Sequence, residues 1–219
     1  MVDIFDEVEE ELRAERTKAF MKKYGGLLFG ACVAMIGAAV GWQGWQWRQT
    51  HQDMEAAAQY LAAASRTEGG GVAGRDRTEA AVAFEAAAAN APDGYRLLAR
   101  LRAAALRAEA GDLIAASALW DQITADKSVD PLLRDLASLT WCLYHADQGD
   151  PALLEGRLNP LAAPGNAWRS LAAEQLAILD LRRGRTEEAK TRLKKLAEDT
   201  TAPAGVRGRA SALLERMNG

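Results

Sequence analysis

The chain has 219 residues and a net charge of −3, close enough to neutral that it offers neither a basic field for nucleic acid nor an acidic solvating tail. Helix-forming Ala, Leu, Glu, Arg and Gln dominate while β-branched residues are sparse, which predicts an all-α protein. One cysteine, Cys32, lies in an apolar segment and the other, Cys142, lies far downstream, which excludes a disulfide framework.

Residues 1–23 are predicted to form a cytoplasmic amphipathic tail. Asp3 can cap the helix, acidic residues come first and basic ones last, and this order complements the helix dipole. The apolar residues on or near one face are Phe5, Val8, Leu12 and Phe20. Two interpretations remain open, a solvated helix that only sets topology and a dedicated cytoplasmic binding motif.

Residues 24–47 contain no charged side chain, and we expect them to form a transmembrane helix. Such a helix would be roughly 36 Å long, against about 30 Å for the hydrocarbon core of a bilayer. The alternatives are a cleaved signal peptide and a buried core helix. The segment ends in three tryptophans instead of a small-residue cleavage site, and core helices without charge over this length are rare.

The flanking charges predict the orientation of this helix. Lysines and arginines crowd its N-terminal side, whereas Arg48 is followed by a long gap on the other side. We therefore expect a single-pass protein of the bacterial inner membrane with a cytoplasmic N-terminus and a periplasmic C-terminal domain.

Small residues recur at a spacing of four in the apolar segment, and this pattern predicts that the helix packs on another membrane helix. The residues are Gly26, Gly30 and Ala34, followed by Gly37 and Gly41. The alternative is that this stripe simply faces lipid.

Residues 48–78 are expected to form a membrane-proximal helix, from Gln49 to Ser65, followed by a glycine-rich loop. Three consecutive glycines, Gly69 to Gly71, cost too much backbone entropy for a helix. They are not followed by the Gly-Lys-Ser/Thr of a phosphate-binding loop.

Residues 79–219 carry repeat anchors spaced 36, 38 and 35 residues apart, a period near 34 that predicts a stack of helical hairpins. Each repeat carries a small or apolar residue, a bulky residue four positions later and another apolar residue three further on. These triads are Ala80, Phe84 and Ala87; Ala116, Trp120 and Ile123; Leu154, Leu158 and Leu161; and Ala189, Leu193 and Leu196. Gly111, Gly149 and Gly184 precede three of them as turns.

A partner helix is expected upstream of each turn, and a terminal helix from Gly205 to Asn218 is expected to cover the last open face. The apolar stripes of three partner helices begin at Leu97, Leu132 and Leu171. Pro131 and Pro203 stand near hairpin ends, where a helix cannot continue.

The segments GDLIAASALWDQI at 111–123 and GRTEEAKTRLKKLAEDTTAP at 184–203 resemble the second helix of tetratricopeptide repeats. The first helices lack the Trp, Leu-Gly and Tyr signature of that family, which leaves the repeat boundaries open. The whole chain is similar to the family of ancillary SecYEG translocon subunits, through DIFDEVEEELRAER, KKYGG, GWQGWQWRQ and the repeats. The resemblance implies association with the Sec translocon and with periplasmic chaperones or their exported clients.

The candidate chemistry lies at Cys142 and His145, which are spaced to share a helix face, with Asp147 nearby as an acid or ligand. A zinc site needs three or four protein ligands, so a buried thiol and a packed imidazole are the simpler interpretation. We expect no metal or cofactor. Three tryptophans, Trp120, Trp141 and Trp168, either line a peptide-binding groove or pack in the core.

These observations together predict a non-enzymatic scaffold that binds other proteins, since repeat stacks present extended concave surfaces. The first alternative keeps this architecture and serves another envelope assembly, such as cytochrome maturation or cell division. The second is an enzyme built around Cys142 and His145.

Overall fold

The computed structural model describes residues 4–67 and 74–218, with the side chains of 4–21, 25, 27, 28, 74, 75 and 218 outside that description. All regular structure in these ranges is helical. In chain order the helices are α1 (Ile4–Ser65), α2 (Gly74–Ala89), α3 (Asp93–Glu109), α4 (Leu113–Ala125), α5 (Pro131–Tyr144), α6 (Pro151–Leu161), α7 (Arg169–Arg182), α8 (Thr186–Glu198) and α9 (Ala204–Asn218).

The chain divides into two units, Met1–Met54 and Glu55–Gly219. The first unit contains most of α1, a helix of 62 residues that runs without a break through positions 23/24 and 47/48. Ala56 and Ala63, in the last turns of α1, are buried within the second unit.

The prediction of a transmembrane helix at 24–47 is wrong. Among the described residues, no helix is long and apolar enough to cross a membrane. The prediction relied on the absence of charge, whereas a spanning helix needs a high content of Leu, Ile, Val and Phe. The segment instead contains six glycines and two glutamines, Gln43 and Gln46.

The expected localisation rested on that helix and is corrected with it. Because no membrane-crossing helix is found in the described part of the chain, a single-pass inner-membrane protein with a periplasmic domain is not supported.

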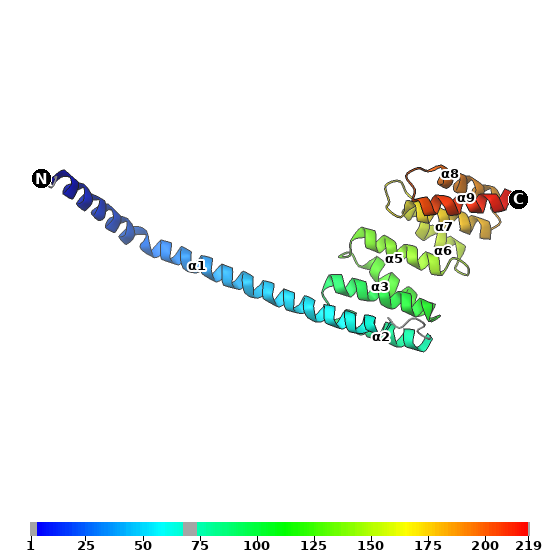
Figure 1. Cartoon of the computed structure of the whole chain (residues 1–219), viewed down its shortest axis with the longest axis horizontal. Coiled ribbons are helices and arrows are strands. Elements are labelled where there is room, and N and C mark those ends of the chain that lie inside the picture. The colour runs from blue at the N-terminus through cyan, green and yellow to red at the C-terminus, as the bar shows by residue number, and fades with distance from the viewer. Residues whose placement is uncertain (1–3, 68–73, 219) are drawn as a thin grey trace. The chain divides into compact units, whose positions relative to one another are not determined.

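The second unit is the predicted stack of helical hairpins, and α2 to α9 follow one another through it (Figure 1). The four triads of the repeat lie on α2, α4, α6 and α8. Every one of their side chains is buried, from 0% exposure at Ala80, Ala116 and Ala189 to 6% at Ala87. The prediction of an all-helical repeat stack is confirmed, because the small residue allows close helix approach and the bulky one fills the core.

The turns between helices follow the expected chemistry. Gly111 and Gly184 adopt φ of +89° and +71°, a left-handed conformation that favours glycine after a helix. The carboxylate of Asp112 accepts a hydrogen bond from the backbone N–H of Ala115 and so caps α4. Asp150 caps α6 in the same way.

Gly149 is required for a different reason, and Gly149→Ala should lower the free energy of unfolding by about 1–3 kcal/mol. A Cβ atom at this position would lie 2.7 Å from the carbonyl oxygen of His145, a backbone atom that cannot move away cheaply. Gly156→Ala is the matched control. It adds a methyl group in open space on α6 and should stabilise the helix by up to about 1 kcal/mol. Urea unfolding followed by circular dichroism measures both, and equal stability of the Gly149→Ala and native chains would contradict this.

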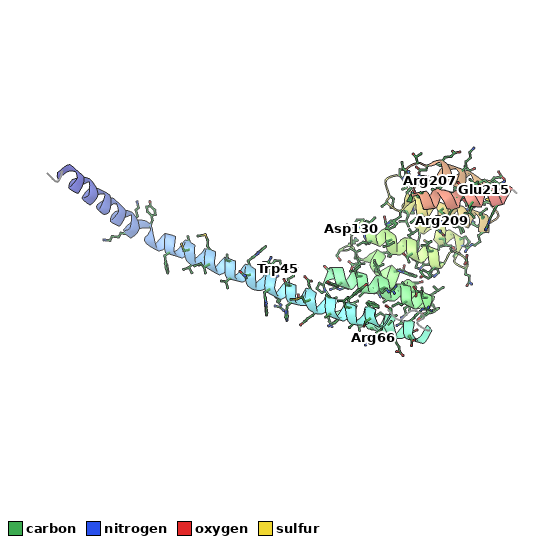
Figure 2. All side chains as sticks on the ribbon, viewed as in Figure 1. Trp45, Arg66, Asp130, Arg207, Arg209 and Glu215 are labelled. Carbon is green, nitrogen blue, oxygen red and sulfur yellow. The ribbon has the colours of Figure 1, made fainter. Side chains whose placement is uncertain are left out.

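Helix α9 closes the stack as predicted, with Val206 and Ala210 buried against Leu193 and Leu196 of α8. An ion pair with a buried carboxylate also holds it. Glu174 of α7 is 3% exposed and accepts hydrogen bonds from Nε and Nη2 of Arg209, each 2.6 Å long. Figure 2 shows Arg209 on α9.

Candidate protein-interaction surface

The three tryptophans assigned to a groove or to the core occupy different environments. Trp120 is 1% exposed and Trp141 is 6% exposed, and both belong to the main core cluster. Trp168 is half-buried at the start of α7 and donates its Nε1 hydrogen to the carbonyl of Leu132, 2.9 Å away. A groove formed by these three residues stays a prediction.

Trp141 lies in a layer of stacked planar groups that joins α4, α5 and α6. The ring of His145 stacks on it with centroids 3.9 Å apart and planes 6° apart. The guanidinium of Arg157 lies 4.1 Å from its ring centroid and donates to Asp121 of α4 at 2.8 Å. These contacts lock neighbouring hairpins together.

Cys142 and His145 do not assemble a nucleophile and a base. His145 Nδ1 lies 2.8 Å from the carbonyl oxygen of Trp141 and must donate to it, and Nε2 lies 3.2 Å from the Ser117 hydroxyl. Burial raises the pKa of Cys142 to about 12, so its thiol stays protonated at neutral pH. Among the described residues, no group of three or more His, Cys, Asp or Glu is placed to hold a metal ion.

The aromatic surface of the second unit is instead presented by Tyr144, at the end of α5. Its side chain is 38% exposed, and its ring stacks on the buried Trp120 at 5.2 Å and 28°. Burial raises the pKa of Tyr144 above its ordinary value; the charge of Glu109 adds to the rise and that of Arg102 opposes it. One positive and one negative side chain of α3 therefore lie near this ring.

Helix α3 extends the surface, because Leu98, Arg102 and Glu109 are spaced to lie along one stripe of it. Leu98 is 51% exposed. We name these three residues together with Tyr144 the Tyr144 patch. It offers an aromatic ring, an aliphatic side chain and charges of both signs.

A hollow lies where α3 begins, beside the loop between α4 and α5, and its lining includes Arg96 and Arg100. Its polar groups already have partners within the protein. Asp126 accepts hydrogen bonds from the backbone and hydroxyl of Ser128, which hold the pKa of Asp126 below its ordinary value. Arg100 lies 3.9 Å from the same carboxylate.

The small-residue stripe of α1 is open. A Cβ atom added at Gly26, Gly30, Gly37 or Gly41 would meet nothing within 4 Å, and Ala34 is exposed. Packing of this stripe on another helix stays a prediction. The predicted cap at Asp3, the apolar face of the tail at 5–20 and the loop glycines Gly69 to Gly71 lie outside the described residues and side chains.

The hairpin stack and its closing helix define an all-helical repeat protein. A family model described as a tetratricopeptide repeat-like domain matches residues 18–191, well over half of the chain, and the chain belongs to this family. The match begins within α1 and ends within α8. Comparisons with curated proteins and with solved structures found no match. Proteins of this repeat fold typically bind other proteins and are typically non-catalytic.

Proposed function

We propose that this protein is an interaction scaffold that binds a segment of a partner protein at the Tyr144 patch. The observation that carries the proposal is that the partly exposed ring of Tyr144 stacks on the buried indole ring of Trp120. An aromatic side chain held in this way loses little conformational freedom when a partner covers it.

The charges beside the ring favour a partner segment that carries both an apolar or aromatic residue and charged residues. Arg102 and Glu109 each act on Tyr144 electrostatically, so both charges lie near its ring, and Glu109 also pairs with Arg77 of α2 at 3.6 Å. Such flanking charges select among partners more than they add affinity.

For the partner itself we propose the Sec translocon, or the chaperones and clients of exported proteins. The support is the sequence resemblance of 3–16, 22–26, 41–49 and the repeats to the ancillary translocon subunits. A scaffold for cytochrome maturation or cell division is the second candidate, since the same architecture would serve either assembly.

Affinity purification of the full-length chain with Tyr144→Ala tests the proposal. Because truncation of a central aromatic anchor typically costs about 2 kcal/mol, we expect recovery of the bound partner to fall by roughly 30-fold. Leu153→Ala is the control, because Leu153 is a 48% exposed side chain on α6 outside the patch. Circular dichroism of each variant verifies folding.

Two results would overturn the proposal. Equal partner recovery by the native chain and the folded Tyr144→Ala variant would exclude the patch. Recovery of cytochrome-maturation or division proteins, without translocon or chaperone components, would replace the proposed partner with the second candidate.

A further inference from the structure

One set of exposed apolar residues follows a seven-residue period along α1 within the first unit. Val33, Val40, Trp47 and Met54 are each seven residues apart, and their exposed fractions lie between 53% and 69%. Leu61 continues the period in the sequence. Such a heptad repeat places the residues on one slowly turning stripe of a helix.

A second set of residues lies three positions after the first and completes the heptad. It comprises Ile36, Gln43 and Thr50, all exposed. In coiled-coil terms the first set occupies the a positions and the second the d positions. The two sets together form the seam that a partner helix would cover.

The surface of α1 is hollowed along this seam. One groove is lined by residues 39, 40, 43, 44, 46, 47 and 50. Each of them falls at an a, d, e or g position of the heptad. These are the positions whose side chains form the holes that receive the knobs of a facing helix.

We propose that the occupant of this seam is the same helix of a second copy of the chain, in a parallel two-stranded coiled coil over residues 33–54. In such a pair Val40, Gln43 and Trp47 would each face their own copy, and Gly44, beside Gln43, leaves room for the facing helix. A surface that carries its own complement suits a two-fold symmetric pair.

Charge and polarity support the same occupant. The e and g positions beside the seam hold Gly37, Ala39, Gly44, Gln46, His51 and Asp53. Asp53 is the only acidic residue among them, and in a parallel pair it would face Ala58 of the other copy, so no like charges would oppose one another. Gln43 is the polar residue at a d position in the apolar part of the seam. In a parallel, in-register pair it faces its own copy and can form an amide hydrogen bond, which fixes the register.

The seam overlaps the small-residue stripe only in part. Gly30 and Gly37 fall at e positions and Ala34 and Gly41 at b positions, whereas Gly26 falls at an a position ahead of the proposed coiled coil. The tryptophans Trp42 and Trp45 fall at c and f and pair with each other outside the seam at 5.7 Å. Trp45, labelled in Figure 2, is therefore a suitable control position on the outer face of the helix.

Cysteine cross-linking of the full chain tests the proposal. In a Cys32→Ser background, Val40→Cys and Met54→Cys place thiols in the seam, whereas Ala38→Cys and Gln52→Cys place them at f positions. Mild oxidation should link the seam variants into a species of twice the 23.6 kDa chain mass, at least about 10-fold more than the f-position variants. Cross-links between identical positions also require a parallel, in-register pair.

Light scattering on the unoxidised chain gives the independent readout. We expect a dimer that Val40→Lys with Trp47→Lys dissociates and that Ala38→Lys with Trp45→Lys leaves intact. A monomeric native chain, or equal cross-linking from seam and f positions, would overturn the proposal. Neither result depends on the Tyr144 patch, so a failure here is distinct from a failure of the proposed function.

Discussion

Replacing Trp120 with alanine should lower the free energy of unfolding by about 3–5 kcal/mol, the range found when a buried aromatic side chain is removed. Trp120 is 1% exposed and belongs to a cluster with Ala116, Ile123 and Leu154. The substitution leaves a cavity between hairpins that the rigid helices cannot fill. It also removes the indole ring on which Tyr144 stacks, so partner binding at the Tyr144 patch should weaken together with stability.

Urea denaturation of the full chain, followed by circular dichroism, measures this loss. Trp45→Ala is the control, because Trp45 is 59% exposed on α1 and its removal should change stability by less than about 0.5 kcal/mol. A Trp120→Ala chain as stable as the Trp45→Ala chain would mean that Trp120 does not hold the stack together.

Arg209→Met should detach the closing helix α9 by leaving the buried carboxylate of Glu174 without its two hydrogen bonds. Breaking a fully buried ion pair typically costs about 3–5 kcal/mol. Because the Arg209 side chain is 55% exposed, water can reach the site, and we expect about 2–3 kcal/mol. Hydrogen exchange of the α9 amides should rise before that of α4.

A double-mutant cycle separates the ion pair from other effects. Glu174→Gln in the Arg209→Met background should recover part of the stability, since it removes the unpaired charge. Arg216→Met changes an exposed arginine on the same helix and should be nearly neutral. If the effects of Arg209→Met and Glu174→Gln simply add, the two side chains are not coupled as described.

The repeat stack was predictable because each hairpin is defined by residues that lie close together in the sequence. A small residue, a bulky one four positions later and a turn glycine define a hairpin without knowledge of its neighbours, and all four triads are buried as expected. The capping aspartates Asp112 and Asp150 act within three residues of themselves. The helical repeat fold and its family could therefore be predicted from the sequence.

The character of α1 was not predictable in the same way. Freedom from charge between Tyr24 and Trp47 suggested a membrane span, but the glycines and glutamines of that segment make it less apolar than the absence of charge implied. Its heptad of exposed apolar residues begins inside the segment and runs beyond it to Met54. Because the predicted segments met at residue 47, the seven-residue period that crosses this boundary was not recognised.

The Tyr144 patch was missed because its parts come from separate helices. Tyr144 lies in the WCLYHAD stretch, in which Cys142 and His145 were the candidate functional residues. Nothing in the sequence links Tyr144 to Arg102 or Glu109. The fold brings the charges of both residues near the Tyr144 ring, which itself stacks on Trp120. The exposed tyrosine at the end of a partner helix was the available signal, but spacing along one helix cannot show which side chains another helix supplies.

Site-specific photo-crosslinking in cells decides whether the patch binds a partner. A photoreactive phenylalanine replaces Leu98 in the patch or, as control, the exposed Lys194 on α8. Irradiation should yield a discrete adduct with a partner protein from position 98 and not from position 194, and Tyr144→Ala should abolish that adduct. The absence of an adduct at position 98, or the same adduct from both positions, would contradict a protein-binding surface at Tyr144.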